Sequence, residues 1–319
     1  MPKHEAERTN PTHTENKCKC IVSILITTTA DKMESMPYPT FRSNAPVDKE
    51  NKRAALSAVG KCRLFPSSCS PSHQEAFLAI TEKTIEQGRV DTTTFTDDEE
   101  KSRKKSLKKK LMKEGVAMAK SYLMESLGLD VSVVDVEVVL SASDILASDG
   151  CLAACFLDAG CQAIVVDGTN LEAMDVAKIP RKRLVAHFSS VNENADESSV
   201  KDNIAAASAL ASSVSIETES IDVDLMEKFG GWKPNNETEM VMQIGGLDAS
   251  GETAEVLAKA SKANKVRITL VDPTATQMGL CFAGFMRTDR PDGLYTTVVC
   301  TRSNEALGLV YSAKVRVEL

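Results

Sequence analysis

Between residues 131 and 271 the sequence alternates between short apolar runs and amphipathic stretches, and this alternation constrains the fold most strongly. Residues 131–140 (VSVVDVEVVL) have the Val-rich composition of a buried strand. The same patterns predict further strands at 162–166, 183–188, 214–217, 240–244 and 266–271, with helices at 144–159, 171–178, 200–211 and 252–263. Strands that alternate with helices build parallel sheets. The sequence therefore predicts an α/β fold with a βα-rich domain, either half-barrel-like or an open parallel sheet.

Two helices are predicted upstream of this region. The first is a short amphipathic helix at 74–87. The second, at 102–127, follows acidic residues that suit a helix N-terminus and precedes Gly128, which suits a helix end. Its apolar face is expected to carry Leu107, Leu111, Met118 and Tyr122. Both helices are expected to belong to the βα-rich domain.

The two ends of the chain differ from its middle. Residues 1–65 are dominated by Asn, Thr, Ser, Pro and Lys without a sustained period, which predicts a disordered N-terminal leader. Near the C-terminus, GLYTTVVCTRSNEALGLVYS consists of two strand-like runs around a polar turn, which predicts a β-hairpin. We therefore predict three parts: the leader 1–65, the βα-rich domain 66–286 and a separate C-terminal segment 287–319.

The composition limits the classes of partner and the compartment. The net charge of −7 and pI of about 5.3 argue against nucleic-acid binding, which usually needs a basic domain. The apolar run 20–26 is too short to span a membrane. Nine scattered cysteines, an odd number, favour reduced thiols and a cytoplasmic protein. The Ser- and Thr-rich start leaves a transit peptide for a plastid or another organelle as the alternative, although the glutamates there are atypical of one.

One C-terminal segment resembles a known family. The run RTDRPDGLYTTVV at 287–299, followed by LGLVYS at 307–312, is similar to the start of the phosphoribosyl-AMP cyclohydrolase domain in the fungal-type multifunctional histidine biosynthesis protein. That protein joins the cyclohydrolase to phosphoribosyl-ATP pyrophosphohydrolase and histidinol dehydrogenase. The resemblance covers about a tenth of the chain, and residues 131–286 match the family's upstream region only in rhythm and place.

The resemblance implies histidine biosynthesis and a phosphoribosyl substrate. The complete family domain opens the purine ring of phosphoribosyl-AMP by hydrolysis, using zinc to activate water and magnesium near the phosphate. Its metal-binding motifs lie beyond the matching segment, whereas this sequence departs after Ser312 and ends at Leu319. We therefore expect a truncated domain, and we assign no catalytic residue, metal ligand or cofactor to this chain. The oligomeric state stays open, with a homodimer among the options.

Candidate site residues come from the predicted strand ends. Gly245 and Gly246 follow a strand and precede a helix, where backbone N–H groups can bind a phosphate, as in the histidine-pathway isomerase barrels. A simple strand-to-helix turn explains the same pair. Asp167 and Asp272 also follow strands, where a barrel enzyme places acid–base groups, although helix capping is the plainer interpretation of both.

Histidine and cysteine motifs give weaker indications. His187 lies at the end of a predicted strand without an evident partner, so no catalytic triad is predicted. Cys151, Cys155 and Cys161 have spacings that could bring thiolates together, but their apolar surroundings favour buried core residues. Two alternatives to the cyclohydrolase hypothesis stay open: a phosphate-binding, isomerase-like barrel, and a non-catalytic assembly module.

Overall fold

The computed structural model describes most of the chain. The described residues are 39–44, 61–91, 98–128, 134–189, 197–234, 237–245, 251–285, 291–292, 294–300 and 306–312. The chain divides into two compact units, and each is described by itself. One unit, Lys32–Met286, contains the parallel sheet and its helices, and the other includes residues 287–319. The division after Met286 coincides with the C-terminal boundary drawn from the sequence.

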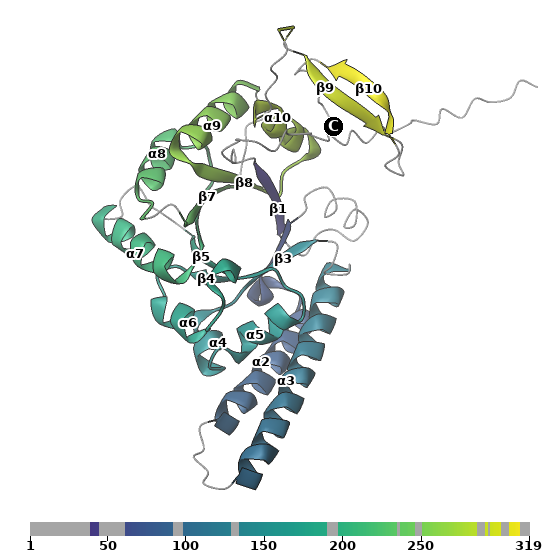
Figure 1. The fold of residues 1–319 in the computed structure, drawn as a ribbon, viewed down its shortest axis with the longest axis vertical. Coiled ribbons are helices and arrows are strands. Elements are labelled where there is room, and N and C mark those ends of the chain that lie inside the picture. The colour runs from purple at the N-terminus through teal and green to yellow at the C-terminus, as the bar shows by residue number, and fades with distance from the viewer. Residues whose placement is uncertain are drawn as a thin grey trace, which may run out of the picture. The chain divides into compact units, whose positions relative to one another are not determined.

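The larger unit is built on a closed barrel of eight parallel strands (Figure 1). The strands are β1 (Thr40–Asn44), β2 (Lys61–Leu64), β3 (Asp135–Val139), β4 (Ala163–Asp167), β5 (Leu184–Phe188), β6 (Ser213–Thr218), β7 (Glu239–Ile244) and β8 (Val266–Val271). They pair in chain order, and β1 pairs with β8 to close the ring. The α/β class is confirmed, whereas the half-barrel or open sheet is corrected to a full barrel.

The two strands that close the barrel lie inside the segment predicted as a disordered leader. Strands β1 and β2 occupy residues 40–44 and 61–64, so the predicted boundary at residue 65 is wrong for this part. Their sequences, TFRSN and KCRL, place charged residues at positions that face the barrel interior. A strand with such a polar inner face has no apolar run, so composition alone misclassified it.

Helices surround the barrel (Figure 1). They are α2 (Pro71–Asp91), α3 (Asp98–Leu127), α4 (Ala142–Ala147), α5 (Cys151–Asp158), α6 (Leu171–Val176), α7 (Glu197–Leu210), α8 (Val223–Gly231), α9 (Gly251–Asn264) and α10 (Ala275–Phe285). The prediction missed α8 and α10. It also joined α4 and α5 into one helix, but Asp149 and Gly150 break it because both have positive φ angles, 48° and 75°.

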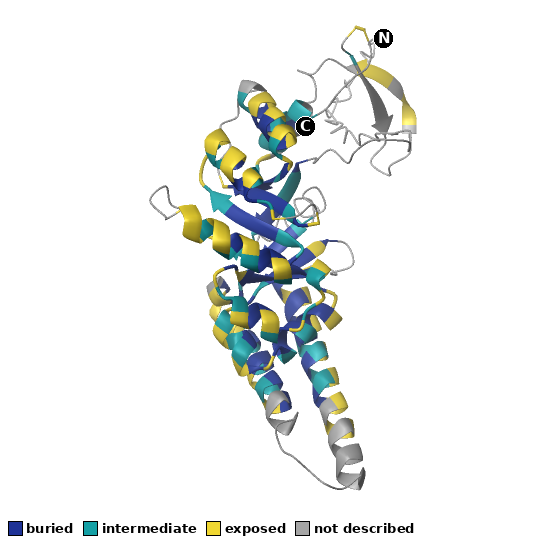
Figure 2. Ribbon diagram, turned by 60° about the vertical axis from the view of Figure 1, so that its left-hand side comes forward, coloured by how far each residue is buried: buried dark blue, intermediate teal, exposed yellow. Residues whose placement is uncertain are grey.

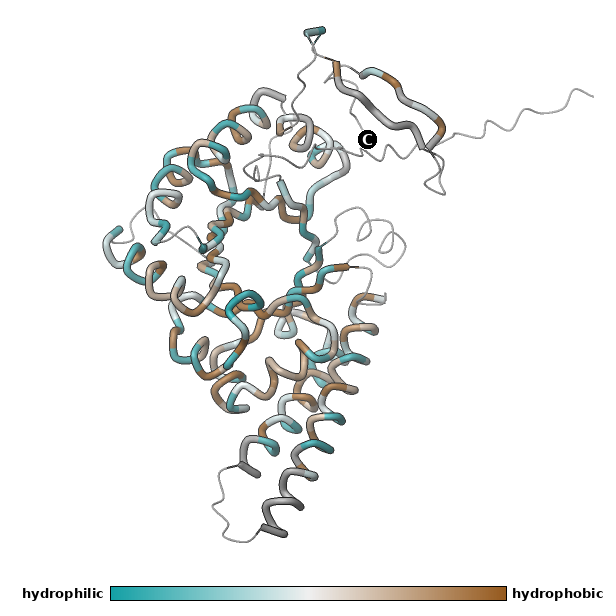
Figure 3. Tube along the Cα trace, viewed as in Figure 1, coloured by the Kyte–Doolittle hydropathy of each residue, from teal (hydrophilic) through white to brown (hydrophobic). Residues whose placement is uncertain are grey.

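The main core lies between the outer face of the barrel and the helices (Figure 2). Alternate strand residues point outward, as Val136 and Val138 do, and are fully buried. The inward-facing residues are largely polar, so hydropathy alternates along several strands (Figure 3). This arrangement places charged side chains at the centre of the barrel and the hydrophobic core around it.

The long helix α3 packs against α2 and α5 through its C-terminal half. Tyr122 and Leu123 are fully buried, and the Tyr122 ring makes an edge contact with Phe156 of α5, with centroids 5.9 Å apart. Gly128 ends the helix as predicted, with φ 63° and its N–H bonded to the Met124 carbonyl oxygen. Leu107, predicted on the apolar face, is instead 46% exposed. The contact face therefore begins further along the helix than the spacing indicated.

The predicted C-terminal hairpin is confirmed. Strands β9 (Tyr295–Cys300) and β10 (Ala306–Ser312) pair antiparallel, with Val298 opposite Leu309 and Thr296 opposite Tyr311. The pairing contains an irregularity between Ala306 and Gly308. Among the described residues of this unit, the structured part is a two-stranded sheet.

Candidate functional site

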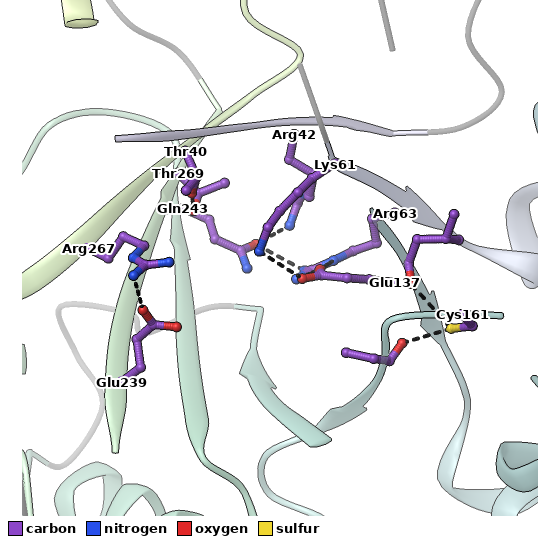
Figure 4. A network of polar contacts seen from close by, with 12 residues as sticks. Thr40, Arg42, Lys61, Arg63, Glu137, Cys161, Glu239, Gln243, Arg267 and Thr269 are labelled. Atoms are coloured by element: carbon purple, nitrogen blue, oxygen red, sulfur yellow. Dashed lines mark hydrogen bonds and ion pairs between the residues drawn. The ribbon is translucent and has the colours of Figure 1, made fainter. Parts of the chain in front are cut away.

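Charged side chains form a connected network inside the barrel (Figure 4). Arg63 of β2 donates two hydrogen bonds to Oε2 of Glu137 on β3, from Nε at 3.0 Å and from Nη2 at 2.7 Å. Gln243 of β7 accepts from both Arg42 (2.6 Å) and Arg63 (3.1 Å) through one amide oxygen. The strands place these residues on the inner face because side chains alternate along each strand. Four strands are thereby tied together across the barrel.

Burial and charge set the protonation states in this network. Burial, reinforced by the nearby Arg63 charge, lowers the pKa of Arg42 to about 10. Burial acts to raise the pKa of Glu137, but the positive charges of Arg63 and Lys61 outweigh it, so the pKa is lowered. Glu137 is therefore ionised at neutral pH. Arg42 also remains charged, since even a pKa of about 10 lies well above neutral pH.

A cavity opens at the carboxyl ends of β3 to β6, and we call it the mouth cavity. Its volume is about 650 Å³, which is within the range of small-molecule sites. It is lined by Phe65, Pro66, Ser67, Gln74, Phe77, Leu78, Val139, Leu140, Ser141, Ala142, Asp144, Val165, Val166, Asp167, Asn170, His187, Ser189 and Glu217. Helix α2 forms one wall, and the polar groups come mainly from the strand ends. Active sites of βα barrels lie at this end of the strands.

His187 is held between two partners at the floor of the mouth cavity. Its Nε2 lies 3.3 Å from Oε2 of Glu217, and its Nδ1 lies 2.9 Å from Oγ of Ser215. Burial lowers the pKa of His187 despite the opposing effect of Glu217, while the hydrogen bond from His187 lowers the pKa of Glu217. A neutral ring beside an ionised carboxylate must donate from Nε2, so Nδ1 accepts from the Ser215 hydroxyl.

The connected residues Ser215, His187 and Glu217 resemble a hydrolytic triad in type but not in placement. Ser215 is 1% exposed and borders a cavity of about 30 Å³ inside the barrel rather than the mouth cavity. A nucleophile must reach the substrate. We conclude that Ser215 orients His187, and that Glu217, whose side chain is 38% exposed, faces the mouth cavity.

Asp167 adds a second carboxylate to the mouth cavity. It ends β4 directly opposite His187 in the strand pairing. Its Oδ1 accepts hydrogen bonds from the backbone N–H of Thr169 at 2.9 Å and from the Thr169 hydroxyl at 2.8 Å. These bonds order the side chain. The cavity therefore has carboxylates from β4 and β6 on either side of the His187 strand.

The structure separates the two aspartates that the sequence grouped. Asp167 ends β4, whereas Asp272 follows β8, four strands away in the ring of eight. Asp272 accepts hydrogen bonds from the Ser43 hydroxyl (3.1 Å) and the Asn44 N–H (2.8 Å). It therefore holds the end of β1 against the end of β8. The hypothesis of an acid–base pair is wrong for Asp272, while Asp167 lies in the mouth cavity.

The predicted phosphate turn is only partly described. The N–H of Gly245 donates to the Thr218 carbonyl oxygen at 3.0 Å, so it is already used within the protein. Gly246 lies outside the described residues. Anion binding at Gly245 and Gly246 therefore stays a prediction. It would depend on backbone N–H groups other than that of Gly245.

The cysteines of the predicted apolar cluster lie in separate environments. Cys155 is buried against Met112, with the two sulfurs 3.8 Å apart. Cys161 donates to the carbonyl oxygens of Val136 (3.3 Å) and Ala163 (3.1 Å). Burial raises the pKa of both thiols to about 12. Protonated thiols bonded to the backbone are typical of core residues. Within the described part of the chain, no group of His, Cys, Asp and Glu residues has metal-binding geometry.

Sequence reasoning missed the residues that matter most in the barrel. Glu217, Ser215 and Glu137 were treated only as parts of strands. A signal was nevertheless present, because polar residues alternate with apolar ones in SVSIET of β6 and DVEVV of β3. In a closed barrel such alternation places polar groups inside. Recognising it required knowing which strand face was enclosed.

Comparisons with known proteins add little to this geometry. No protein-family model matches the chain, and no curated protein is significantly similar to it. Two crystal structures of a "putative isomerase from Sinorhizobium meliloti", one in an open loop conformation, match with 12% and 13% identity and TM-scores of 0.42 and 0.40. Each match covers 88% of this chain and 61% of the other, so the chain spans less than two thirds of those proteins. Among the described helices, none is long and apolar enough to cross a membrane.

Proposed function

We propose that the barrel binds a small polar metabolite in the mouth cavity and catalyses a proton transfer, with Glu217 as the general base. One observation carries this proposal: the Glu217 carboxylate faces the cavity while His187 Nε2 holds it at 3.3 Å. An ionised carboxylate at the carboxyl end of a barrel strand is suited to remove a proton next to a carbonyl group.

Asp167 supplies the second proton-transfer group. The proton that Glu217 takes from a substrate carbon must return to a neighbouring atom if the net reaction is an isomerisation, and no electrons are gained or lost. Asp167, at the end of β4, takes the proton of the substrate hydroxyl and returns it to the neighbouring carbonyl oxygen, while Glu217 moves the carbon-bound proton to the neighbouring carbon. His187 orients Glu217 and is a positioning residue in this scheme. The proposal corresponds to the isomerase-like alternative derived from the sequence.

Hydrogen exchange tests the proposal without knowing the exact substrate. The protein is incubated in D₂O with a panel of small hydroxycarbonyl compounds and their phosphates, and loss of carbon-bound hydrogen is followed by proton NMR. The Glu217→Gln variant keeps the shape but lacks the base, so exchange should fall by about 10²–10⁴-fold. The exposed helix residue Glu172 provides a matched control, and Glu172→Gln should exchange at the wild-type rate. Exchange that persists in Glu217→Gln would refute the assignment.

A second candidate function rests on the C-terminal unit. We propose, from the resemblance of residues 287–312, that the β9–β10 hairpin is the opening of a phosphoribosyl-AMP cyclohydrolase domain in a histidine biosynthesis protein. The antiparallel pairing of β9 with β10 supports a strand pair in this segment. A protein in which the family's downstream segment follows Ser312 should hydrolyse phosphoribosyl-AMP when zinc and magnesium are added. A fused protein without turnover would count against this candidate.

A further inference from the structure

Arg42 is a buried cation that makes no direct ion pair among the described residues, although the carboxylates of Glu137, Glu217 and Asp272 act on it at longer range. The residue is 1% exposed, and its Nη1 donates to the neutral amide oxygen of Gln243 at 2.6 Å. Its Nε and Nη2 are buried and have no hydrogen-bond acceptor among the described residues. The nearby carboxylate of Glu137 is bonded to Arg63 instead. A buried charge without a partner is costly, so a ligand that balances it would stabilise the fold.

Arg42 borders the small cavity inside the barrel, which we call the inner cavity. Its volume is about 30 Å³, and its walls carry four cationic side chains (Arg42, Lys61, Arg63 and Arg267) against two carboxylates (Glu137 and Glu239). Arg267 is paired with Glu239 at 2.7 Å and Arg63 with Glu137 at 2.7 Å, as Figure 4 shows. Lys61 also lies 3.9 Å from the other oxygen of Glu137, so Arg42 is the cation of this lining that has no ion pair of its own among the described residues. A cavity whose lining carries more cations than carboxylates attracts a small anion.

The volume of the inner cavity limits which anions can fit inside it. About 10–15 Å³ is enough for one water-sized particle, so about 30 Å³ accommodates a single-atom anion but not phosphate or sulfate, which have five heavy atoms. Thr40, Ser215 and Thr269 also line the cavity. From the unpaired donors of Arg42, the excess positive charge and the volume, we propose that the inner cavity is a binding site for a halide ion, with chloride as the physiological ligand.

The site is distinct from the proposed catalytic site. The inner cavity is lined by the starting residues of β2, β6 and β7, including Lys61, Ser213 and Glu239, whereas the mouth cavity lies at the carboxyl ends of β3 to β6. Chloride would stabilise the barrel by neutralising Arg42 and would not take part in the reaction. The proposal therefore holds or fails independently of the proton-transfer function.

Thermal unfolding in different salts tests the halide site. The Tm of the full chain is measured in sodium chloride and in sodium gluconate at equal ionic strength, which separates specific binding from screening. We expect the Tm to rise with chloride and to saturate, by about 5–10 °C at about 100 times the Kd. Bromide should replace chloride, and the NMR line of free chloride should broaden in the presence of the protein and narrow when bromide is added. Equal Tm values in chloride and gluconate would overturn the proposal and leave water as the occupant.

Two variants locate the effect at the inner cavity. Gln243→Glu has nearly the same shape and places a carboxylate at the atom that accepts from Arg42 and Arg63, so it should remove the chloride dependence while retaining the fold. Lys228→Met removes a surface charge that is 56% exposed, and it should keep the full dependence. Arg42→Met, if it folds, should behave like Gln243→Glu. A chloride effect that survives in Gln243→Glu would place the ion elsewhere and refute the assignment.

Discussion

His187 on β5 donates a hydrogen bond to Glu217 on β6 across 3.3 Å, and this contact makes a neutral imidazole the support of an ionised carboxylate. Ser215 completes the arrangement from the other side of the ring. His187 lies on β5, and Ser215 and Glu217 lie on the neighbouring β6. The pairing of His187 with Ser215 in the sheet therefore brings the three side chains together. The expected consequences concern pH, the buried ion pair, chain geometry and packing.

Folding stability should fall as the pH drops below about 6.5 because of His187. Its ordinary pKa is 6.5 and burial lowers it in the folded state, so the unfolded chain binds a proton first and protonation favours unfolding. Urea unfolding of the wild type and of His187→Gln over pH 5–8 measures the difference. The slope attributable to one histidine is at most about 1.4 kcal/mol per pH unit. His187→Gln should lose it, and an unchanged slope between about pH 5 and 6.5 would contradict the buried neutral ring.

Removing one partner of the Arg63–Glu137 pair should destabilise the barrel strongly. Glu137→Gln leaves the buried Arg63 uncompensated, and we expect a loss of about 3–5 kcal/mol in the free energy of unfolding. The double change Arg63→Met with Glu137→Met removes both charges and should recover much of that loss. Glu114→Gln breaks a surface pair with Lys83 and should cost far less than Glu137→Gln, because solvent screens an exposed pair. If the double variant is less stable than Glu137→Gln, the charge explanation is wrong.

Gly150 should not tolerate a side chain. Its φ of 75° is unfavourable for other residues, and an added Cβ would lie 2.7 Å from the Val176 carbonyl oxygen. Gly150→Ala should therefore cost at least about 1–2 kcal/mol by denaturant unfolding. Gly231 ends α8, and an added Cβ there would have no atom within 4 Å. Gly231→Ala should be neutral or slightly stabilising, and equal effects of the two changes would refute the steric argument.

Phe156 should be essential for docking α2 and α3 on the barrel. It is fully buried and contacts the rings of Phe77 (centroids 6.2 Å apart) and Tyr122 (5.9 Å). Phe156→Ala should lower the free energy of unfolding by about 3–5 kcal/mol, because a large cavity replaces the ring. Leu107→Ala, at a position 46% exposed on α3, should change it by less than about 0.5 kcal/mol. A small effect of Phe156→Ala on calorimetric unfolding would show that these helices dock by other contacts.

The sequence alone determined the elements whose apolar pattern is local. The apolar runs predicted as strands became β3 to β8 in part or whole, Gly128 ended α3, and the two runs near the C-terminus paired as β9 and β10. In the predicted strands and in α3, the apolar residues repeat with the period of a strand or of a helix. The α/β class follows from that repeat without knowledge of distant contacts.

Only the tertiary structure decided that the sheet closes and what it encloses. Strands β1 and β2 are short, and their inner faces carry Arg42 and Arg63, so their local pattern is that of an irregular segment. They become strands because β8 and β3 provide backbone partners and Gln243 and Glu137 accept from the arginines. The strand order places Asp167 and Asp272 four strands apart, and the pairing of β5 with β6 brings Glu217 to His187. Contacts between residues so far apart in the chain have no local periodicity, and the sequence could not reveal them.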